Sequence, residues 1–113
     1  MSVLSELIGL LEPIVPTYTS VYTGENTPKY AVLTPLVDSL EYFTDNKPNF
    51  LSEEVRVSLF VKGNYLQTKN RVIKALLREE LDITDMRYVE CEQDTGYHHY
   101  AIDVKKHENI KEI

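Results

Sequence analysis

The sequence contains no tryptophan, one cysteine and four glycines that stand far apart from one another. The single cysteine, Cys91, has no partner for an internal disulfide, which fits a chain made in a reducing cytoplasm. The sequence has no glycine-rich phosphate-binding loop and no Gly-x-Ser-x-Gly nucleophile motif. The chain therefore lacks the usual sequence signatures of nucleotide-binding proteins and of serine hydrolases.

Basic residues are also few, with 12 lysines and arginines against 18 aspartates and glutamates and a formal net charge of -6. Such a chain has no basic patch with which to displace counterions from phosphates, so we do not expect free nucleic-acid binding. Long apolar runs are missing as well, because Glu6 and Glu12 interrupt the N-terminal hydrophobic residues. We therefore expect no signal peptide, no membrane-spanning helix and no membrane partner.

The composition that remains is that of one globular domain. The chain has 113 residues, of which 42% are hydrophobic, and a chain of this length buries roughly two-thirds of its unfolded surface. It can therefore fold without disulfides or metal. We expect one domain over residues 1–105 and a flexible C-terminal tail over residues 106–113, which is polar apart from Ile110 and Ile113.

The first third of the chain predicts one helix and two strands. Apolar residues repeat at helical spacing over residues 2–11, with Ser2 as the N-cap. This apolar stripe could pack on the chain's own sheet or on a neighbouring molecule. Residues 17–23 and 29–37 have strand composition and flank turn-forming residues, which favours an antiparallel hairpin. Pro35 removes a backbone donor, so the second strand lies at an edge or contains a bulge.

The second half predicts a strand, a helix and two more strands. Apolar and polar residues alternate over residues 53–62, and Asn64 is a good N-cap for a helix over residues 65–80. Strands over residues 86–93 and 97–105 follow. The apolar faces consist of Val55, Val57, Leu59 and Val61 in the first strand and Leu66, Ile73, Leu76 and Leu77 in the helix. The order α-β-β-loop-β-α-β-β predicts an α+β fold, a mostly antiparallel sheet with both helices on one face.

Residues 38–52 interrupt this pattern, because loop-forming residues alternate there with bulky apolar ones. The apolar members are Leu40, Tyr42, Phe43, Phe50 and Leu51. A loop of this length in a small domain is usually functional or mobile. Its apolar side chains could form a small cluster under the loop, or the segment could be an arm that contacts another subunit or a partner protein.

The motifs that could indicate catalysis have simpler interpretations. Asp94-Thr95-Gly96 matches the aspartic-protease triplet, but its polar flanks cannot supply the dry site in which two carboxylates share a proton. A hairpin turn is the expected structure there. His98 and His99 point to opposite faces of a strand, so they cannot bind one metal within a subunit, even with Cys91 nearby. We therefore expect no catalytic residue, no metal, no cofactor and no enzyme activity.

A family resemblance rests on the segment from residue 54 to residue 105. The strand Glu54-Val55-Arg56-Val57-Ser58-Leu59-Phe60 runs through Val61-Lys62-Gly63-Asn64-Tyr65 into a basic amphipathic helix, and an Asp-Thr-Gly hairpin with aromatic-rich strands follows. With the N-terminal helix, the Thr27-Pro28-Lys29-Tyr30 segment and the acidic middle loop, this order resembles the tail completion, or tail terminator, proteins of long-tailed bacteriophages. The resemblance covers about residues 2–105.

The resemblance implies a structural protein of the virion tail, assembled in the cytoplasm of the bacterial host. Copies of the chain would form a ring, a hexamer, at the head-proximal end of the tail tube. The ring would stop polymerisation of the tube and join the tail to the head. Its partners would be other copies of itself, the tail tube protein and the head–tail connector or stopper protein, and DNA would pass through the ring without specific binding.

Two further expectations concern surfaces of such a ring. The apolar residues of the 38–52 segment would form the subunit or partner interface, by strand addition or by insertion of Phe43 or Phe50 into a neighbour. Acids that repel DNA phosphates would face the channel, unless they only solvate the surface. These acids are Asp38, Glu41, Asp45, Glu53 and Glu54. Two alternative functions remain: another head–tail joining subunit, and a cytoplasmic dimeric regulatory or ligand-binding domain.

Overall fold

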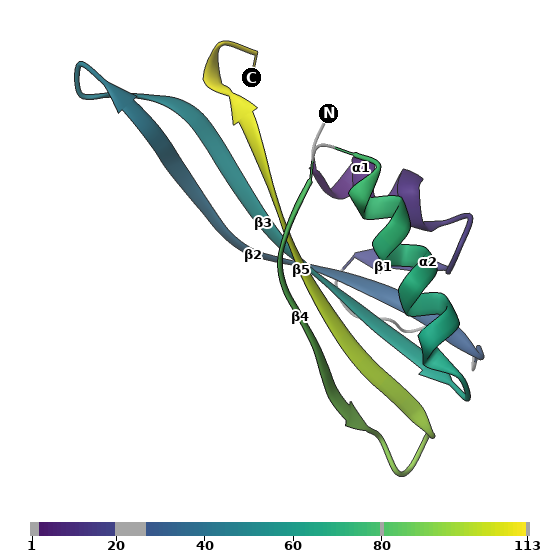
Figure 1. The fold of residues 1–113 in the computed structure, drawn as a ribbon. Coiled ribbons are helices and arrows are strands. Elements are labelled where there is room, and N and C mark those ends of the chain that lie inside the picture. Colours follow the sequence, from purple (N-terminus) through teal and green to yellow (C-terminus); the bar gives the residue numbers. More distant parts are fainter. Residues whose placement is uncertain (1–2, 20–26, 80, 113) are drawn as a thin grey trace.

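The computed structural model describes residues 3–19, 27–79 and 81–112, and it confirms the predicted α+β class. The elements in chain order are α1 (Val3–Leu11), β1 (Thr17–Thr19), β2 (Lys29–Thr44), β3 (Lys47–Lys62), α2 (Tyr65–Leu77), β4 (Asp82–Cys91), β5 (Tyr97–Asn109) and the 3-10 helix η1 (Ile110–Glu112). Both helices lie on one side of a five-stranded sheet, and the other face carries no helix in the described part of the chain (Figure 1).

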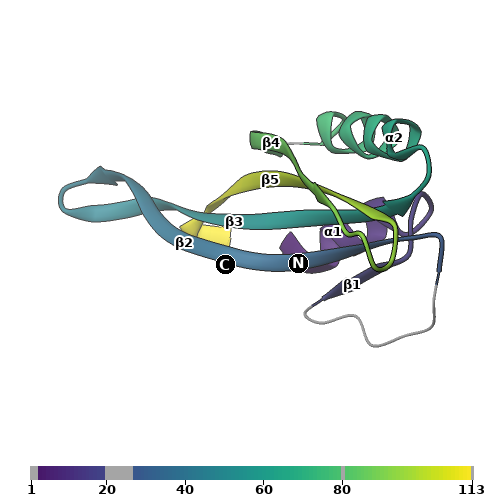
Figure 2. The ribbon, with the colours of Figure 1, turned by 90° about the horizontal axis from the view of Figure 1, so that it is seen from below.

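The strand order in the sheet is β1-β2-β3-β5-β4, and Figure 2 shows these strands from below. The pairs β2–β3, β3–β5 and β4–β5 are antiparallel. The register of β2 against β3 shifts between Pro35 and Val37, and β1 ends opposite Leu33. The predicted bulge at Pro35 is therefore confirmed.

The first predicted hairpin is wrong. Strand β1 pairs with β2 in parallel, with Thr17 opposite Ala31 and Thr19 opposite Leu33, and the Ala31 amide donates to the Pro16 carbonyl at 2.8 Å. Turn-forming residues show where a chain bends but do not determine the direction of the next strand. The connection here is also far longer than a two-residue hairpin turn. Residues 20–26 of this prediction lie outside the described residues.

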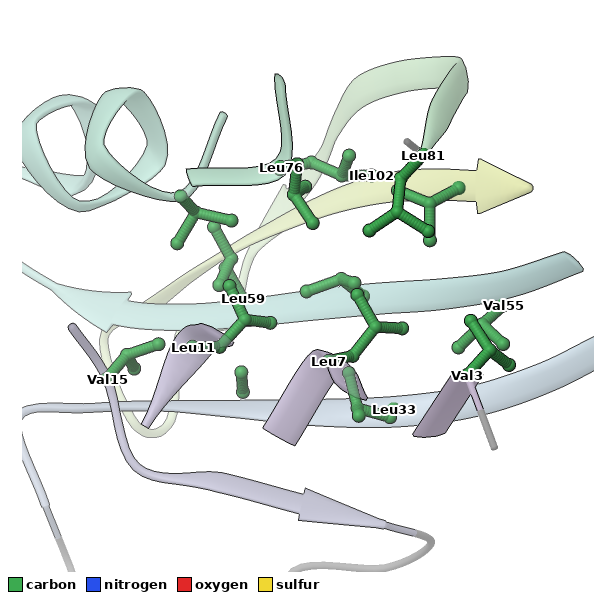
Figure 3. Close-up of a cluster of buried hydrophobic side chains, with 14 residues drawn as sticks. Val3, Leu7, Leu11, Val15, Leu33, Val55, Leu59, Leu76, Leu81 and Ile102 are labelled. Carbon is green, nitrogen blue, oxygen red and sulfur yellow. The ribbon is translucent and has the colours of Figure 1, made fainter. Parts of the chain in front are cut away.

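The hydrophobic core fills the space between the sheet and the helices (Figure 3). In α1, Val3, Leu7 and Leu11 are buried, so the apolar stripe packs on the chain's own sheet. Strand β3 buries its predicted apolar face, and full burial of each such side chain is worth about 1.5–3 kcal/mol. That face consists of Val55, Val57, Leu59 and Val61. The predicted N-cap Ser2 lies outside the described residues.

Helix α2 begins as predicted, but it is rotated relative to the expected orientation. Asn64 is the N-cap, and its Oδ1 accepts a hydrogen bond from the Leu66 amide at 3.1 Å. Leu66 and Leu77, expected in the core, are 48% and 65% exposed. Leu76 is buried as predicted and Ile73 packs against the core, whereas Thr68, Val72 and Ala75 complete the buried stripe in place of Leu66 and Leu77. Both stripes have helical spacing, and contact with α1 and β3 decides between them.

The segment predicted as an irregular loop is a continuous β-hairpin. Strands β2 and β3 extend to a two-residue turn, Asp45-Asn46, in which both residues have positive φ, 52° and 62°. Asp and Asn tolerate this left-handed backbone, and paired strands satisfy the backbone polar groups that an open loop would leave to water. The hairpin projects beyond the helices (Figure 1).

The C-terminal residues also differ from the expected loose tail. Strand β5 continues through Lys106–Asn109, which pair with residues 50–53 of β3, and η1 follows. The long β2–β3 hairpin offers these residues a strand to pair with, which the sequence pattern did not reveal. The whole chain measures 54 × 25 × 22 Å with a radius of gyration of 15.4 Å, against about 13 Å for a compact chain of this length.

Replacing Asn64 with Ala should remove the side-chain acceptor for the first turn of α2. We expect the free energy of unfolding to fall by about 1 kcal/mol, measured by urea denaturation. The matched control is Asn70→Ala, an exposed position within the same helix. Equal effects of the two substitutions would contradict a capping role for Asn64.

Candidate functional site: the arm and the exposed sheet edges

We call residues 38–52 the arm. Leu40, Tyr42 and Phe43 are 53%, 61% and 61% exposed, whereas Phe50 and Leu51 are half-buried. The exposure of the first three residues rules out a cluster tucked under a loop. The arm therefore presents apolar side chains to the outside, as one of the two alternatives predicted.

Side-chain contacts hold the distal part of the arm in one conformation. The Tyr42 ring meets the Phe50 ring edge-on at 5.5 Å between centroids and lies 5.7 Å from the His107 ring. Tyr42 has a φ of 58°, a left-handed conformation that costs a residue with a Cβ about 1–3 kcal/mol. The ring contacts offset part of this cost. Near the turn, the Asn49 side chain donates to the Thr44 hydroxyl at 2.8 Å.

Glu41 anchors the arm to the rest of the sheet. Its carboxylate contacts Lys105 Nζ at 2.8 Å and His107 Nε2 at 2.9 Å, and it accepts a hydrogen bond from Ser52 Oγ at 3.1 Å. These contacts connect β2 to β5 across β3. The hydrogen bond from Lys105, more than those from His107 and Ser52, holds the pKa of Glu41 below its usual value, against the effect of desolvation. The charge of Glu41 is therefore paired within the chain, and the residue has a structural role.

The other acids expected to line a channel do not share one surface. Asp38 lies opposite Glu53 in the register, whereas Glu54 lies opposite Lys105 on the other face of the sheet. Burial, followed by the nearby charges of Asp38 and Glu108, raises the pKa of Glu53. Asp45 is in the turn at the tip of the arm and is exposed. The structure thus brings Asp38 and Glu53 together and separates them from the remaining acids.

The sheet face without helices carries an aromatic row that the sequence pattern did not reveal. The rings of Tyr30, Phe60 and His99 stack across β2, β3 and β5, with centroids 4.8 and 4.3 Å apart. Tyr97 meets Tyr30 edge-on, and its hydroxyl donates to the Thr27 carbonyl. His99 Nε2 is buried without a hydrogen-bond partner in the described structure, and burial lowers the pKa of His99. The row forms because the register places these residues opposite one another on neighbouring strands, and the sequence pattern does not give that register.

The two adjacent histidines lie on opposite faces, as predicted. His98 Nδ1 is 2.9 Å from the Tyr88 hydroxyl on the helix side, whereas His99 stacks on Phe60 on the other side. Cys91 lies opposite His98 and is exposed rather than buried among apolar side chains, as a strand cysteine usually is. Among the residues that the structure describes, no three His, Cys, Asp or Glu side chains are grouped to hold a metal ion.

The Asp94-Thr95-Gly96 triplet forms the predicted hairpin turn. It connects β4 to β5, Gly96 has a φ of 77°, and its amide donates to the Glu92 carbonyl at 2.7 Å. The Thr95 hydroxyl donates to the Glu92 carboxylate at 3.2 Å. Asp94 is exposed, so the triplet does not create the dry two-carboxylate site of an aspartic protease.

Strand β4 forms the second exposed edge of the described sheet. It pairs only with β5 there, and nine of its ten residues are exposed. The exposed residues include Met86, Tyr88 and Val89, which are 43–47% accessible. An edge with apolar side chains and unpaired backbone groups is a site for strand addition. The chain therefore offers two possible pairing edges, at β4 and along the arm portion of β2.

No protein-family model matches the chain, and no curated protein matches it significantly. The resemblance to tail terminator proteins therefore rests on the residues and element order described above. Among residues 3–19, 27–79 and 81–112, no helix is long and apolar enough to cross a membrane.

Replacing Glu41 with Gln should destabilise the chain at neutral pH, because it removes the anion that holds Lys105 and His107. A carboxyl group with a lowered folded-state pKa stabilises the fold above its unfolded pKa, and this effect is lost as pH falls through the folded value. The stability difference between wild type and E41Q should therefore shrink below about pH 4.3. Urea denaturation of both proteins at about five pH values between pH 3 and pH 7 would measure this stability difference.

The matched control is Glu53→Gln at the base of the same arm. Because the pKa of Glu53 is raised, its charged form is disfavoured in the folded state, and the substitution should leave the chain at least as stable at neutral pH. Wild type should approach E53Q as acid protonates Glu53. If E41Q and E53Q shift stability in the same direction at pH 7, the anchoring role of Glu41 is wrong.

Proposed function

We propose that the chain is a structural subunit of a phage tail, and that its copies form a ring at the head-proximal end of the tail tube. The ring ends polymerisation of the tube and joins it to the head connector or stopper. Two independent lines support this proposal. The first is the resemblance of residues 2–105 to tail terminator proteins. The second is the arm, a structured hairpin that presents apolar side chains outside the core.

The arm is the observation on which the proposal chiefly rests. Leu40, Tyr42 and Phe43 stand exposed on a hairpin that is already paired and anchored through Glu41. Exposed apolar side chains gathered on one projection mark an interaction site more often than a solvated surface. Because the hairpin is ordered before binding, association loses less conformational entropy than the ordering of a flexible loop would.

A ring requires that one patch of each copy meets a different patch of the next copy. The arm and the β4 edge lie on different strands at different sides of the molecule and have different compositions (Figure 1). Their separation suits a head-to-tail contact. The net charge of -6 fits a channel through which DNA passes, because like charge prevents adhesion to phosphates. The exposed acids of the arm, Asp38 and Asp45, are the candidates to face that channel.

A dimer is the competing proposal, and the aromatic row on the uncovered sheet face favours it. Two such faces could pack against each other through Tyr30 and Phe60, as sheets pack in β-sandwiches. A dimeric regulatory or ligand-binding domain would use this face and leave the arm free. Particle mass distinguishes the two assemblies.

Replacing Tyr42 and Phe43 together with Ser should abolish ring formation and leave the fold intact, because both side chains are 61% exposed. Loss of a central aromatic contact costs about 2 kcal/mol or more per residue in protein interfaces. Mass photometry with and without added tail tubes would measure assembly, and circular dichroism would verify folding.

The matched control is Leu77→Ser, an apolar position on α2 that is 65% exposed and far from the arm. It should assemble like wild type. A wild-type chain that forms only dimers and does not bind tail tubes would refute the ring. Unfolding of the Tyr42/Phe43 variant would show that these residues belong to the core of the fold.

A further inference from the structure

A shallow groove runs along one flank of α2. It is lined by Ile14, which follows α1, and by Arg71, Lys74, Ala75 and Arg78. The three basic residues recur at spacings of three and four, which places them along one side of the helix. Half-buried Ile14 supplies most of the apolar surface of the groove, because Ala75 is only 6% exposed. The groove thus combines an apolar floor with a basic wall.

The basic side chains of this groove have no acid to neutralise them within the described chain. Arg71, Lys74 and Arg78 are exposed, and none forms an ion pair with residues 3–19, 27–79 or 81–112. By contrast, the lysines and arginines that form ion pairs among the described residues lie on strands of the sheet. In a chain with a net charge of -6, this flank therefore carries three positive charges that form no ion pair among the described residues.

The β4–β5 hairpin has the opposite character. From residue 82 to residue 96 it contains five acidic residues and one basic residue, Arg87. The acids are Asp82, Asp85, Glu90, Glu92 and Asp94. Exposed Val89 lies among these charges and is 45% accessible. The turn of this hairpin extends past the helices (Figure 1). It thus has the charge and the protruding shape that the groove on α2 complements.

The groove and the hairpin cannot meet within one copy of the chain. The flank of α2 that carries Tyr65 and Lys69 contacts the β4–β5 side, through Tyr88 and Tyr100. The groove is on the flank that faces Ile14. The two surfaces therefore point in different directions, which is the arrangement that a head-to-tail contact between copies requires.

We propose that the α2 groove of one copy binds the acidic β4–β5 hairpin of a second copy. This contact deepens the proposed ring and rests on it, since it adds a second complementary pair of surfaces, groove and hairpin, to the contact made by the arm. Opposite charges orient the two copies, and Val89 packs against the exposed part of Ile14. A nucleic acid is the less suitable occupant, because the net charge of -6 repels a polyanion.

Charge reversal on each side tests the contact. Arg71→Glu with Arg78→Glu reverses the groove, and Glu90→Lys with Asp94→Lys reverses the hairpin. Each double variant should raise the concentration needed for assembly by about tenfold or more, measured by sedimentation velocity. A chain that carries all four substitutions should regain assembly, because both charges are then reversed. Lys111→Glu is the control, since it makes the charge change of one groove substitution at a distant position on η1.

Salt dependence gives a second measurement on the same proteins. Wild-type assembly should weaken between 0.1 M and 1 M salt, as the screening length falls from about 10 Å to about 3 Å. The groove variant and the hairpin variant should lose part of this dependence. Failure of the four-substitution chain to recover assembly, with its fold verified by circular dichroism, would overturn the proposed contact.

The outcomes separate this contact from the ring. A wild-type ring that neither reversal weakens refutes the contact and leaves the ring in place. A wild-type dimer that both reversals dissociate refutes the ring and retains the contact. A wild-type chain that stays monomeric at all concentrations refutes both.

Discussion

The pairing of β3 on both sides is the constraint on which the other parts of the structure depend. Strand β3 is hydrogen-bonded to β2 through the whole arm and to β5 from Phe50 to Lys62. Its alternate residues are buried under both helices. A slip of one residue would turn that apolar face to solvent, so the register cannot change without loss of the core. The positions of the arm and of the aromatic row follow from this register.

Polar contacts on the uncovered face reinforce the same register. Arg56 forms a two-pronged ion pair with Asp103, at 2.8 and 3.1 Å, between β3 and β5. Within the arm, Glu41 of β2 contacts Lys105 and His107 of β5 and so connects strands on either side of β3. A bidentate ion pair of this kind fixes the relative orientation of the two side chains and also stabilises their contact. The sheet therefore extends as an ordered hairpin well past the helices.

The surfaces available for assembly differ in character, which is why we favour a ring over an unspecific aggregate. The arm is apolar at Tyr42 and Phe43, the α2 groove is basic, and the β4–β5 hairpin is acidic. Long exposed edges normally carry a risk of uncontrolled pairing. Charge on β4, with the bulge near Pro35 in β2, restricts which partners such edges accept.

The sequence by itself determined the elements whose pattern is local. Alternation defined the buried face of β3, Asn64 defined the start of α2, and Asp94-Thr95-Gly96 defined a turn, because each depends on neighbouring residues only. The residues of the arm were also identified from sequence, but their conformation was not. Only the tertiary structure decided the parallel direction of β1, the rotation of α2 and the strand that holds Lys106–Asn109. Each of these features depends on which segment, distant in the sequence, lies beside the element in the fold, and a local sequence pattern does not contain that information.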